Sequence, residues 1–240
     1  MDQIFKELKI IEKVMITHNV VKIVLKYENK LPEMIVSSFV FIYDDNANYR
    51  PYTPLKILSD TTMEFAIKVY QNGLLSRYIN SRPLGSFLKV KFFIKKLSYE
   101  HNKYNHILMI SGGTGITPCI QVLNSALVNE NKTKFTLLNF NKTENDVFCK
   151  EYFNEYEKSG KFNLINVYTQ DNSIPYKGHF TKEMFEKINK EFGEFDFVYV
   201  CGPQKMMKEV SGNKNPDKSQ GSILGVLSEI GFSNKNVYKF

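Results

Sequence analysis

The sequence predicts two structural classes within one chain, an antiparallel β-barrel in about the first hundred residues and an α/β parallel sheet in the remainder. In the first part, short apolar segments alternate with polar residues, which is typical of strands buried on one face. In the second part, apolar strand patterns alternate with helical ones, which is typical of a parallel sheet. A glycine-dense turn at residues 112–115 stands between a strand pattern and a helix pattern.

Five strand segments are expected in the first part. They are LKIIEKVMI and VVKIVLKY on either side of the turn at His18-Asn19, IVSSFVFIY after Leu31-Pro32, MEFAIKVY (Met63–Tyr70) and FLKVKFFI (Phe87–Ile94). In the second segment Val21, Ile23 and Leu25 alternate with lysines, so one face of the strand is apolar and the other is charged. Five or six strands in so short a stretch suit a small barrel.

The second part alternates between strand and helix. The expected strands are Ile107–Ser111, Phe135–Asn141, Phe162–Thr169 and Phe195–Cys201, with helices behind Pro118, through Glu151–Lys158 and from Thr181. Parallel sheets of this kind bind ligands at the carboxyl ends of their strands. The glycine turn and the segment Cys201-Gly202-Pro203 both fall at such ends.

Composition favours a globular protein that is not secreted. The 240 residues are 42% hydrophobic and 14% aromatic, which is enough for a substantial core. No apolar run approaches the roughly 18–20 residues that a membrane helix needs, and the first residues, MDQIFKELK, lack the order of a signal peptide. Cys119, Cys149 and Cys201 form no C-x-x-C pair. Disulfide, zinc and iron-sulfur frameworks are therefore disfavoured, a reducing compartment fits best, and no metal is expected.

The net charge of +7 is concentrated in the first part. Residues 1–100 hold 15 Lys and Arg against 10 Asp and Glu, a balance of +5, whereas residues 101–240 hold 17 against 15, a balance of +2. Such a surface can attract an acidic protein, an anionic membrane or nucleic acid, or it can simply be solvated. No long basic run with interleaved aromatics indicates a nucleic-acid groove, so we expect no nucleic-acid partner.

The segment ILMISGGTGITPCIQVL (Ile107–Leu123) is the centre of the second part. Its small, hydroxyl and helix-starting residues are Gly112, Gly113, Thr114, Gly115, Thr117 and Pro118. Glycines let a backbone approach a ligand closely, and the free amides at a helix start form a seat for phosphate. The dinucleotide fingerprint would need a third glycine at Pro118, and the lysine of a phosphate-binding P-loop is absent. Glycines that serve only a sharp turn are the alternative.

Two stretches of the first part carry further candidate chemistry. In YRPYTP (49–54), Arg50 offers a planar fork for phosphate oxygens, Tyr52 a ring for stacking and Thr53 a hydroxyl. In NGLLSRYI (72–79), a glycine turn leads into a short helix with Ser76 in its first turn, which is a second phosphate seat of the same kind. A surface salt bridge and a simple turn are the respective alternatives.

These segments, in this order, resemble a known family. The ordered set is RPYTP (50–54), IKVY (67–70), GLLS (73–76), GGTGITP (112–118), CGPQKMM (201–207) and a terminal phenylalanine. The set resembles the ferredoxin-NADP reductase superfamily and, within it, the NADH-cytochrome b5 reductase branch. The resemblance covers nearly the whole chain, and the tail from Ser211 to Phe240 is similar to fungal-type members.

The resemblance implies a ferredoxin reductase-like fold, with an FAD-binding β-barrel domain in residues 1–102 and a Rossmann-like NAD(P)H-binding α/β domain in residues 103–240. It implies that Arg50 holds the FAD pyrophosphate, Tyr52 packs on the isoalloxazine and Thr53 hydrogen-bonds near its reactive nitrogen. The other FAD-binding positions that it implies are Pro51, Ile67, Lys68, Tyr70, Gly73, Leu75, Ser76 and, from the second domain, Thr117.

For NADH, the resemblance implies that Cys201 shapes the pocket beside the reactive nicotinamide carbon, so Thr53 and Cys201 are the expected catalytic residues. A buried thiol that merely ends a strand is the alternative for Cys201. Asp171 matches an acidic residue that favours NADH, because a carboxylate accepts from ribose hydroxyls and repels the extra phosphate of NADPH. Lys142 would tolerate that phosphate, so NADPH stays possible. The remaining NADH-binding positions are Gly112, Gly113, Thr114, Gly115, Pro118, Gly202, Pro203, Met206 and Phe240.

Three features depart from the pattern of relatives. VKFFIKK lacks their Gly-Pro turn, MIVSSFV lacks their Gly-Gln-His, and Leu74 stands where a lysine is common. These departures concern the outer contacts of the flavin and leave the hydride path unchanged.

The resemblance implies an FAD-dependent oxidoreductase that passes electrons from NADH through FAD to a separate one-electron acceptor, cytochrome b5 or a similar acidic haem protein. With no cysteine set and a chain ending at Phe240, no haem or iron-sulfur extension is expected. A related reductase that serves a quinone, a small iron protein or a ferric chelate is the alternative enzyme, and a nucleotide-binding regulatory module without turnover is the alternative class. We expect a cytoplasmic monomer, soluble or held at the endoplasmic reticulum or mitochondrial outer membrane through its partner.

Overall fold

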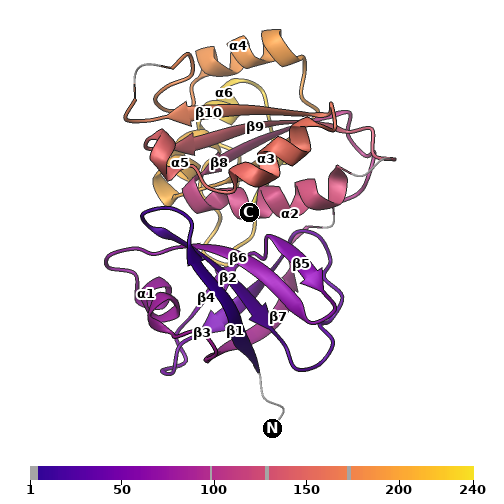
Figure 1. Ribbon diagram of the computed structural model, residues 1–240. Coiled ribbons are helices and arrows are strands. Elements are labelled where there is room, and N and C mark those ends of the chain that lie inside the picture. The colour runs from indigo at the N-terminus through magenta and orange to yellow at the C-terminus, as the bar shows by residue number, and fades with distance from the viewer. Residues whose placement is uncertain (1–4, 98, 128–129, 172–173) are drawn as a thin grey trace. The chain divides into compact units, whose positions relative to one another are not determined.

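The computed structural model describes residues 5–97, 99–127, 130–171 and 174–240 (Figure 1). Its contacts divide the chain into two compact units, one of residues up to Tyr99 with Ile120–Ser125, the other of Glu100–Cys119 with residues from Ala126 onward. The domain boundary after residue 102 stays a prediction. The first four residues, on which the signal-peptide argument partly rests, lie outside the described ranges.

Within the described residues, the first unit is built on a seven-stranded sheet in the order β4-β3-β7-β1-β2-β6-β5. Every neighbouring pair is antiparallel. The strands are β1 Lys6–Met15, β2 Val20–Lys26, β3 Ser38–Tyr43, β4 Tyr49–Tyr52, β5 Lys56–Ser59, β6 Thr62–Lys68 and β7 Phe87–Lys95. The sheet curls around one apolar core, so the predicted barrel is confirmed.

The alternation in β2 works as the sequence predicts. Val21, Ile23 and Leu25 are each fully buried in the barrel core, whereas Lys22 and Lys26 lie on the outside. Burying each aliphatic side chain of this kind contributes about 1.5–3 kcal/mol relative to exposure.

Helix α1, Leu74–Ser81, follows the glycine turn that was expected to precede it. Leu75 and Ile79, four residues apart, are its buried apolar positions, and Ile79 belongs to the barrel core. Gly73 is the N-cap residue.

The second unit contains, among its described residues, a five-stranded parallel sheet in the order β10-β9-β8-β11-β12. The strands are β8 His106–Gly112, β9 Lys134–Asn141, β10 Phe162–Tyr168, β11 Phe197–Cys201 and β12 Val237–Lys239. The helices after β8 are α2 Ile116–Ala126, of which Ile120–Ser125 belong to the first unit, and α3 Lys150–Glu157, α4 Lys182–Phe192, α5 Gln204–Val210 and α6 Gly225–Glu229, with the 3₁₀ turns η1 Gly113–Gly115 and η2 Glu144–Asp146. The predicted parallel sheet is confirmed.

Helices pack against both faces of this sheet. Ile188 of α4, Met207 of α5 and Leu227 of α6 share one core with Leu108 and Ile110 of β8. Helix α3 packs on the opposite face, where the rings of Phe153 and Tyr156 contact Phe162 at centroid distances of 6.4 and 5.5 Å. Strand β8 is therefore buried on both faces along its whole length, as its continuous apolar sequence predicts.

The described residues contain neither a membrane-spanning helix nor a metal-binding cluster. Within those ranges, no helix combines the length and the apolar character that crossing a bilayer requires. Nor do His, Cys, Asp and Glu side chains gather there in groups of three that could hold a metal ion.

Sequence patterns missed several elements and shifted others. The short strands β4, β5 and β12 were not predicted, and β3 begins at Ser38 rather than at Ile35. Ser37, within the segment MIVSSFV, adopts a φ of 69°, in the left-handed region that favours glycine. The hydroxyl oxygens of Ser37 and Ser38 are both buried without a hydrogen-bond partner in the described structure.

Replacing Ser37 by glycine should stabilise the protein. The substitution removes the cost of the left-handed conformation and an unpartnered buried hydroxyl, while adding chain entropy to the unfolded state, so we expect the unfolding free energy to rise by about 1 kcal/mol. Ser38→Gly loses an equivalent hydroxyl from a strand position and should not be stabilising. Urea unfolding of both variants measures the difference; equal effects would rule out backbone strain at Ser37.

Candidate functional site

The glycine turn after β8 (GGTG, residues 112–115) and the loop after β11 (Cys201–Pro203) meet at the carboxyl edge of the parallel sheet. Strands β8 and β11 are neighbours, with Ser111 opposite Cys201. The chain runs from β8 outward to β9 and β10 on one side, and places β11 and β12 on the other. The β8/β11 junction is thus the point where the strand order reverses, and ligands of open α/β sheets bind in the crevice at such a point.

The two loops pack backbone to backbone. A Cβ added to Gly115 would overlap the carbonyl group of Cys201 and lie 2.8 Å from the nitrogen of Gly202. A Cβ on Gly112 would lie 2.9 Å from Cδ of Pro203. Gly113 has a φ of +52°, and no atom lies within 4 Å of the position of its missing Cβ. The turn therefore needs glycine at 115 for close approach, and it leaves open space at 113.

Thr117 and Pro118 lie in the first turn of α2, which begins at Ile116, two residues earlier than the predicted start. The hydroxyl of Thr117 donates to the carbonyl of Thr114 at 3.1 Å. This bond closes the turn between β8 and α2 and orients the amides at the helix start. The N–H of Ile116 already donates to the carbonyls of Gly113 and Thr114, so the features that favour an anionic ligand here are the positive end of the helix dipole and the amides of the glycine turn before Ile116.

Cys201 ends β11 beside this turn, and its sulfur is surrounded by protein although the residue keeps some exposed surface. Desolvation raises the pKa of its thiol to about 12, and Lys214 opposes that rise. Cys119, in α2, is fully buried and also has a raised pKa, because of burial first and of Cys201 second. Cys201 therefore presents a neutral thiol at physiological pH.

The ends of β9 and β10 carry charged residues of both signs. Desolvation raises the pKa of the Tyr168 phenol, and the nearby carboxylates of Glu144 and Asp171 add to the rise. Glu144 also pairs with Lys150 at 3.5 Å. Lys142, just after β9, is exposed. Asp171 and Lys142 thus both lie just beyond the carboxyl ends of β10 and β9, the edge at which parallel sheets bind ligands.

Phe240 lies beside the end of β11. Its backbone nitrogen donates to the carbonyl of Val200 at 2.9 Å, and its ring lies 5.3 Å from that of Tyr199. Lys239, directly before it, is fully buried, and its Nζ donates to the carbonyls of Asn213 and Ser222 at 3.1 and 3.0 Å. Burial lowers the pKa of the Lys239 ammonium. The buried lysine ties the C-terminal strand to the loop that follows α5.

In the first unit, Arg50 and Tyr52 lie on one face of β4, because they pair with the core residues Ile42 and Val40 of β3. Desolvation raises the pKa of the Tyr52 phenol to about 12; the Arg50 guanidinium opposes this rise and Tyr70 adds to it. These three side chains are therefore close together. Arg50 is exposed, so its guanidinium is available to an anion.

A tight turn precedes helix α1. The hydroxyl of Ser76 accepts from the nitrogen of Tyr70 at 3.2 Å and donates to the carbonyl of Gly73 at 3.5 Å. A Cβ on Gly73 would overlap Oγ of Ser76 and lie 3.0 Å from Cβ of Tyr70. The N–H of Arg77 donates to the carbonyl of Gly73, so the backbone amides of the first turn of α1 have no partner within the helix, and an anion site there stays a prediction.

Comparison with known proteins then decides the family. The FAD-binding domain of oxidoreductases matches residues 7–99, and the oxidoreductase NAD-binding domain matches residues 109–212. NADH-cytochrome b5 reductase 2 of Aspergillus niger is 35% identical over 254 residues, covering 100% of this chain and 78% of the relative. The chain belongs to the NADH-cytochrome b5 reductase family. The predicted recognition, enzyme class and cofactors, FAD and NAD, are confirmed.

Solved structures of low sequence identity share the fold of this reductase. The cytochrome b5 reductase domain of Ulva prolifera nitrate reductase aligns with a TM-score of 0.81 at 21% identity, covering 98% of this chain and 97% of that chain. The CS-b5R domains of human Ncb5or, in the NAD+ form, align with a TM-score of 0.79 at 20% identity over 98% of this chain and 69% of that chain.

The residues present fit both cofactors. For NAD, the GGTG turn packs so closely on the Cys201–Pro203 loop that Gly115 has no room for a side chain. Gly113, in the same turn, borders open space, so its backbone is accessible to a ligand. For FAD, Arg50, the Tyr52 ring and the start of α1 supply a cation, a stacking surface and free amides. Ile67 and Leu75 were also predicted to contact FAD, but their side chains are buried, which leaves their backbone for such a contact.

Two supporting side chains were not predicted. Within the first unit, Nε2 of the buried Gln121 donates to the carbonyls of Ser38 and Pro54 at 3.0 and 3.1 Å. Asn124 donates to the carbonyl of Leu55 at 2.8 Å. These bonds fix the backbone directly after Thr53. The signal that could have found them is a pair of amides, three residues apart, in the otherwise apolar pattern of α2.

The close packing at Gly115 makes a specific prediction for Gly115→Ala. The new methyl would overlap the Cys201 carbonyl, so β8 and β11 must separate, and we expect a loss of about 1–3 kcal/mol of stability together with weakened NAD binding. Gly202→Ala is the matched control, because its new Cβ meets chiefly the sulfur of the flexible Met206, at 2.7 Å. Urea unfolding and NAD titration should show the larger effect for Gly115; equal tolerance of both alanines would contradict the close approach.

Proposed function

We propose that this reductase transfers electrons from NADH through FAD to cytochrome b5. The proposal rests on the family and on one observation, the convergence of the GGTG turn and the Cys201–Pro203 loop at the β8/β11 junction. FAD, when bound, accepts a hydride from NADH and passes its electrons singly to a one-electron acceptor. The name of the Aspergillus niger relative supports cytochrome b5 as that acceptor.

On the flavin side, Arg50 binds the pyrophosphate through its fork of donors, and the amides at the start of α1 complete the anion site. Tyr52 stacks on the isoalloxazine, and its raised phenol pKa keeps it neutral there. Thr53 offers a hydroxyl to the reactive edge of the ring. Gln121 fixes the backbone that carries Thr53, through its bond to the Pro54 carbonyl.

On the nicotinamide side, the GGTG turn and α2 hold the pyrophosphate, and Cys201 with Phe240 shapes the nicotinamide pocket. The neutral thiol of Cys201 supplies a compact, uncharged wall, which does not compete as a nucleophile. The sulfur of Met206 lies next to Gly112 and Gly202 and occupies the space into which a Cβ of either glycine would point. Asp171 accepts from the ribose hydroxyls and disfavours NADPH.

The deciding experiment follows the flavin spectrum of the purified protein. Addition of NADH should bleach the yellow flavin, and addition of oxidised cytochrome b5 should restore it while the haem spectrum becomes reduced. A protein that stays colourless when supplied with FAD, or whose flavin NADH cannot bleach, would exclude the function. Faster reoxidation by a quinone or a ferric chelate than by cytochrome b5 would assign a different acceptor.

Arg50→Ala should release FAD without unfolding the barrel. Loss of a charge-assisted, bidentate contact to phosphate predicts a dissociation constant about 10-fold or more higher. Arg50→Lys keeps the positive charge but not the planar guanidinium, so its dissociation constant for FAD should lie between those of the unsubstituted protein and the alanine variant. Flavin fluorescence measures release and circular dichroism measures the fold; unaltered flavin occupancy in the alanine variant would remove Arg50 from the site.

Asp171→Ala should shift the preference from NADH toward NADPH by about 10-fold in the ratio of kcat/KM values. The reason is the loss of a carboxylate that repels the 2′-phosphate. Lys142→Gln should shift the ratio in the opposite direction, because it removes a cation near the same strand ends. Steady-state kinetics with both nucleotides test the pair, and an unchanged ratio in both variants would place the specificity elsewhere.

We further propose that the acidic face of cytochrome b5 docks on the first unit, whose sequence carries the larger positive balance. Reduction of cytochrome b5 should then slow as ionic strength rises, because salt screens the attraction that drives encounter. Stopped-flow rates over a salt series test this, with ferricyanide as the acceptor in the control. We propose a monomer that associates peripherally with membranes, which size-exclusion chromatography and fractionation can test.

A further inference from the structure

The outer face of the β4-β3-β7 sheet carries aromatic rings where polar residues are expected. Strands β3, β4 and β7 lie side by side (Figure 1), and their core-facing residues include Val40, Ile42 and Val90. Alternation therefore turns the intervening residues Phe41 and Tyr43 toward the outside. On antiparallel sheets with one solvated face, these positions are usually polar.

The rings form an unbroken row. Centroid distances are 5.0 Å from Phe39 to Phe41, 4.8 Å from Phe41 to Tyr49, 5.1 Å from Tyr49 to Tyr43 and 5.7 Å from Tyr43 to Phe5. Tyr49 is 47% exposed, and Phe5, Phe41 and Tyr43 are half-buried, whereas Phe39 is buried and closes the row at one end. The row links strand β4 to the start of β1 across β3.

Lysines frame this row. Lys89 and Lys91 pair directly with Tyr43 and Phe41 across β3 and β7. Nζ of Lys89 lies 5.4 Å from the ring centre of Phe5, and Nζ of Lys96 lies 5.1 Å from that of Phe39. We call the five rings with Lys89, Lys91 and Lys96 the aromatic-lysine face.

The acidic groups of this region gather at Lys89. Glu7 pairs with Lys89 across β1 and β7, Asp45 lies 3.9 Å from it, and the carboxylate of Asp44 interacts with it as well. Lys91 and Lys96 are exposed, and the structure shows neither in an ion pair among the described residues. The face therefore presents apolar ring area together with two exposed ammonium groups, those of Lys91 and Lys96.

We propose that the aromatic-lysine face docks directly on an anionic lipid bilayer surface. Phe and Tyr bury their rings at the headgroup boundary, and lysines extend their alkyl stems so that the ammonium groups meet lipid phosphates. The cations that frame the rings are all lysines, whereas protein interfaces are depleted in lysine and enriched in arginine. This chemistry favours a membrane over an acidic protein as the occupant of this face.

The docking face and the flavin face lie on opposite sides of β4. Tyr49 and Pro51 pair with Tyr43 and Phe41 on the outer side, whereas Arg50 and Tyr52 pair with core-facing residues. Lipid binding to the outer side therefore leaves Arg50 and Tyr52 accessible. The inference goes beyond the proposed function, because it requires neither cytochrome b5 nor turnover.

Vesicle sedimentation of the FAD-loaded protein tests the proposal. Binding to phosphatidylcholine vesicles that contain phosphatidylserine should exceed binding to pure phosphatidylcholine and should weaken with salt. The double substitution Lys91→Glu with Lys96→Glu should lower the partition coefficient by about 10-fold or more. Tyr49→Ser, a milder change at an exposed ring, should also weaken binding; flavin content and circular dichroism report the fold of each variant.

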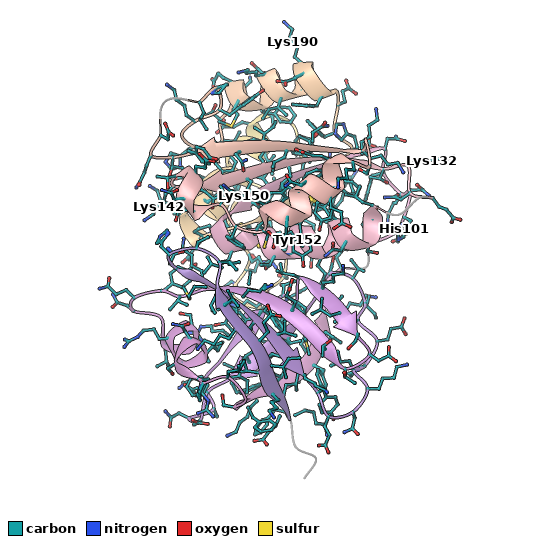
Figure 2. The ribbon with its side chains drawn as sticks, viewed as in Figure 1. His101, Lys132, Lys142, Lys150, Tyr152 and Lys190 are labelled. Carbon is teal, nitrogen blue, oxygen red and sulfur yellow. The ribbon has the colours of Figure 1, made fainter. Side chains whose placement is uncertain are left out.

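The matched control is Lys132→Glu with Lys190→Glu, which makes the same change in net charge on the second unit, where Figure 2 shows both lysines projecting from the surface. The control should bind vesicles like the unsubstituted protein. Equal loss in both double variants, or no preference for phosphatidylserine, would overturn the proposal. Slower cytochrome b5 reduction with unaltered vesicle binding would reassign the face to a protein partner and overturn it as well.

Discussion

The close approach of two backbones at the β8/β11 junction is the constraint around which the second unit is built. Gly115 lies against the carbonyl of Cys201, and a methyl group would already be too large for the space between them. This approach requires β8 and β11 to be parallel neighbours with Ser111 opposite Cys201. It brings a helix start, an open glycine and a thiol to one edge of the sheet. The candidate nucleotide site thus depends on the strand order and on the absence of a side chain at Gly115.

In the first unit, the alternation of side chains along the edge strand β4 places the candidate flavin-binding residues and the exposed aromatic residues on opposite faces of the sheet. Strand β4 is only four residues long, yet successive side chains point to opposite faces, so Arg50 and Tyr52 share one face and Tyr49 shares the other with Phe41 and Tyr43. A single strand can therefore serve a cofactor on one side and a second surface on the other. A shift of register by one residue would exchange the two faces.

Burial, rather than ion pairing, sets the protonation of the candidate site residues. Desolvation is the largest cause of the raised pKa at both Tyr52 and Cys201, so both groups remain neutral near physiological pH. Lys239 is a buried cation whose Nζ meets two carbonyl oxygens. A flavoenzyme leaves the redox steps to its cofactors and supplies orientation, shape and electrostatics. Under the proposed function, the neutral Tyr52 and Cys201 would lie beside the reacting rings and Arg50 would lie at the phosphates, which suits that role of the protein.

The sequence by itself determined the fold class and the family, and it predicted the residues of the candidate site. Alternation in β2 and the continuous apolar run of β8 follow from local periodicity, which records whether a strand is buried on one face or on both. The ordered motifs, from RPYTP to CGPQKMM, needed no coordinates because each is a local requirement for a turn, a cap or a phosphate contact. Only the tertiary structure decided which distant residues meet. The three-residue strand β12, the left-handed Ser37, the support of Pro54 by Gln121 and the row of rings from Phe39 to Phe5 all depend on pairing between segments far apart in the chain, and short-range patterns carry no record of such pairing.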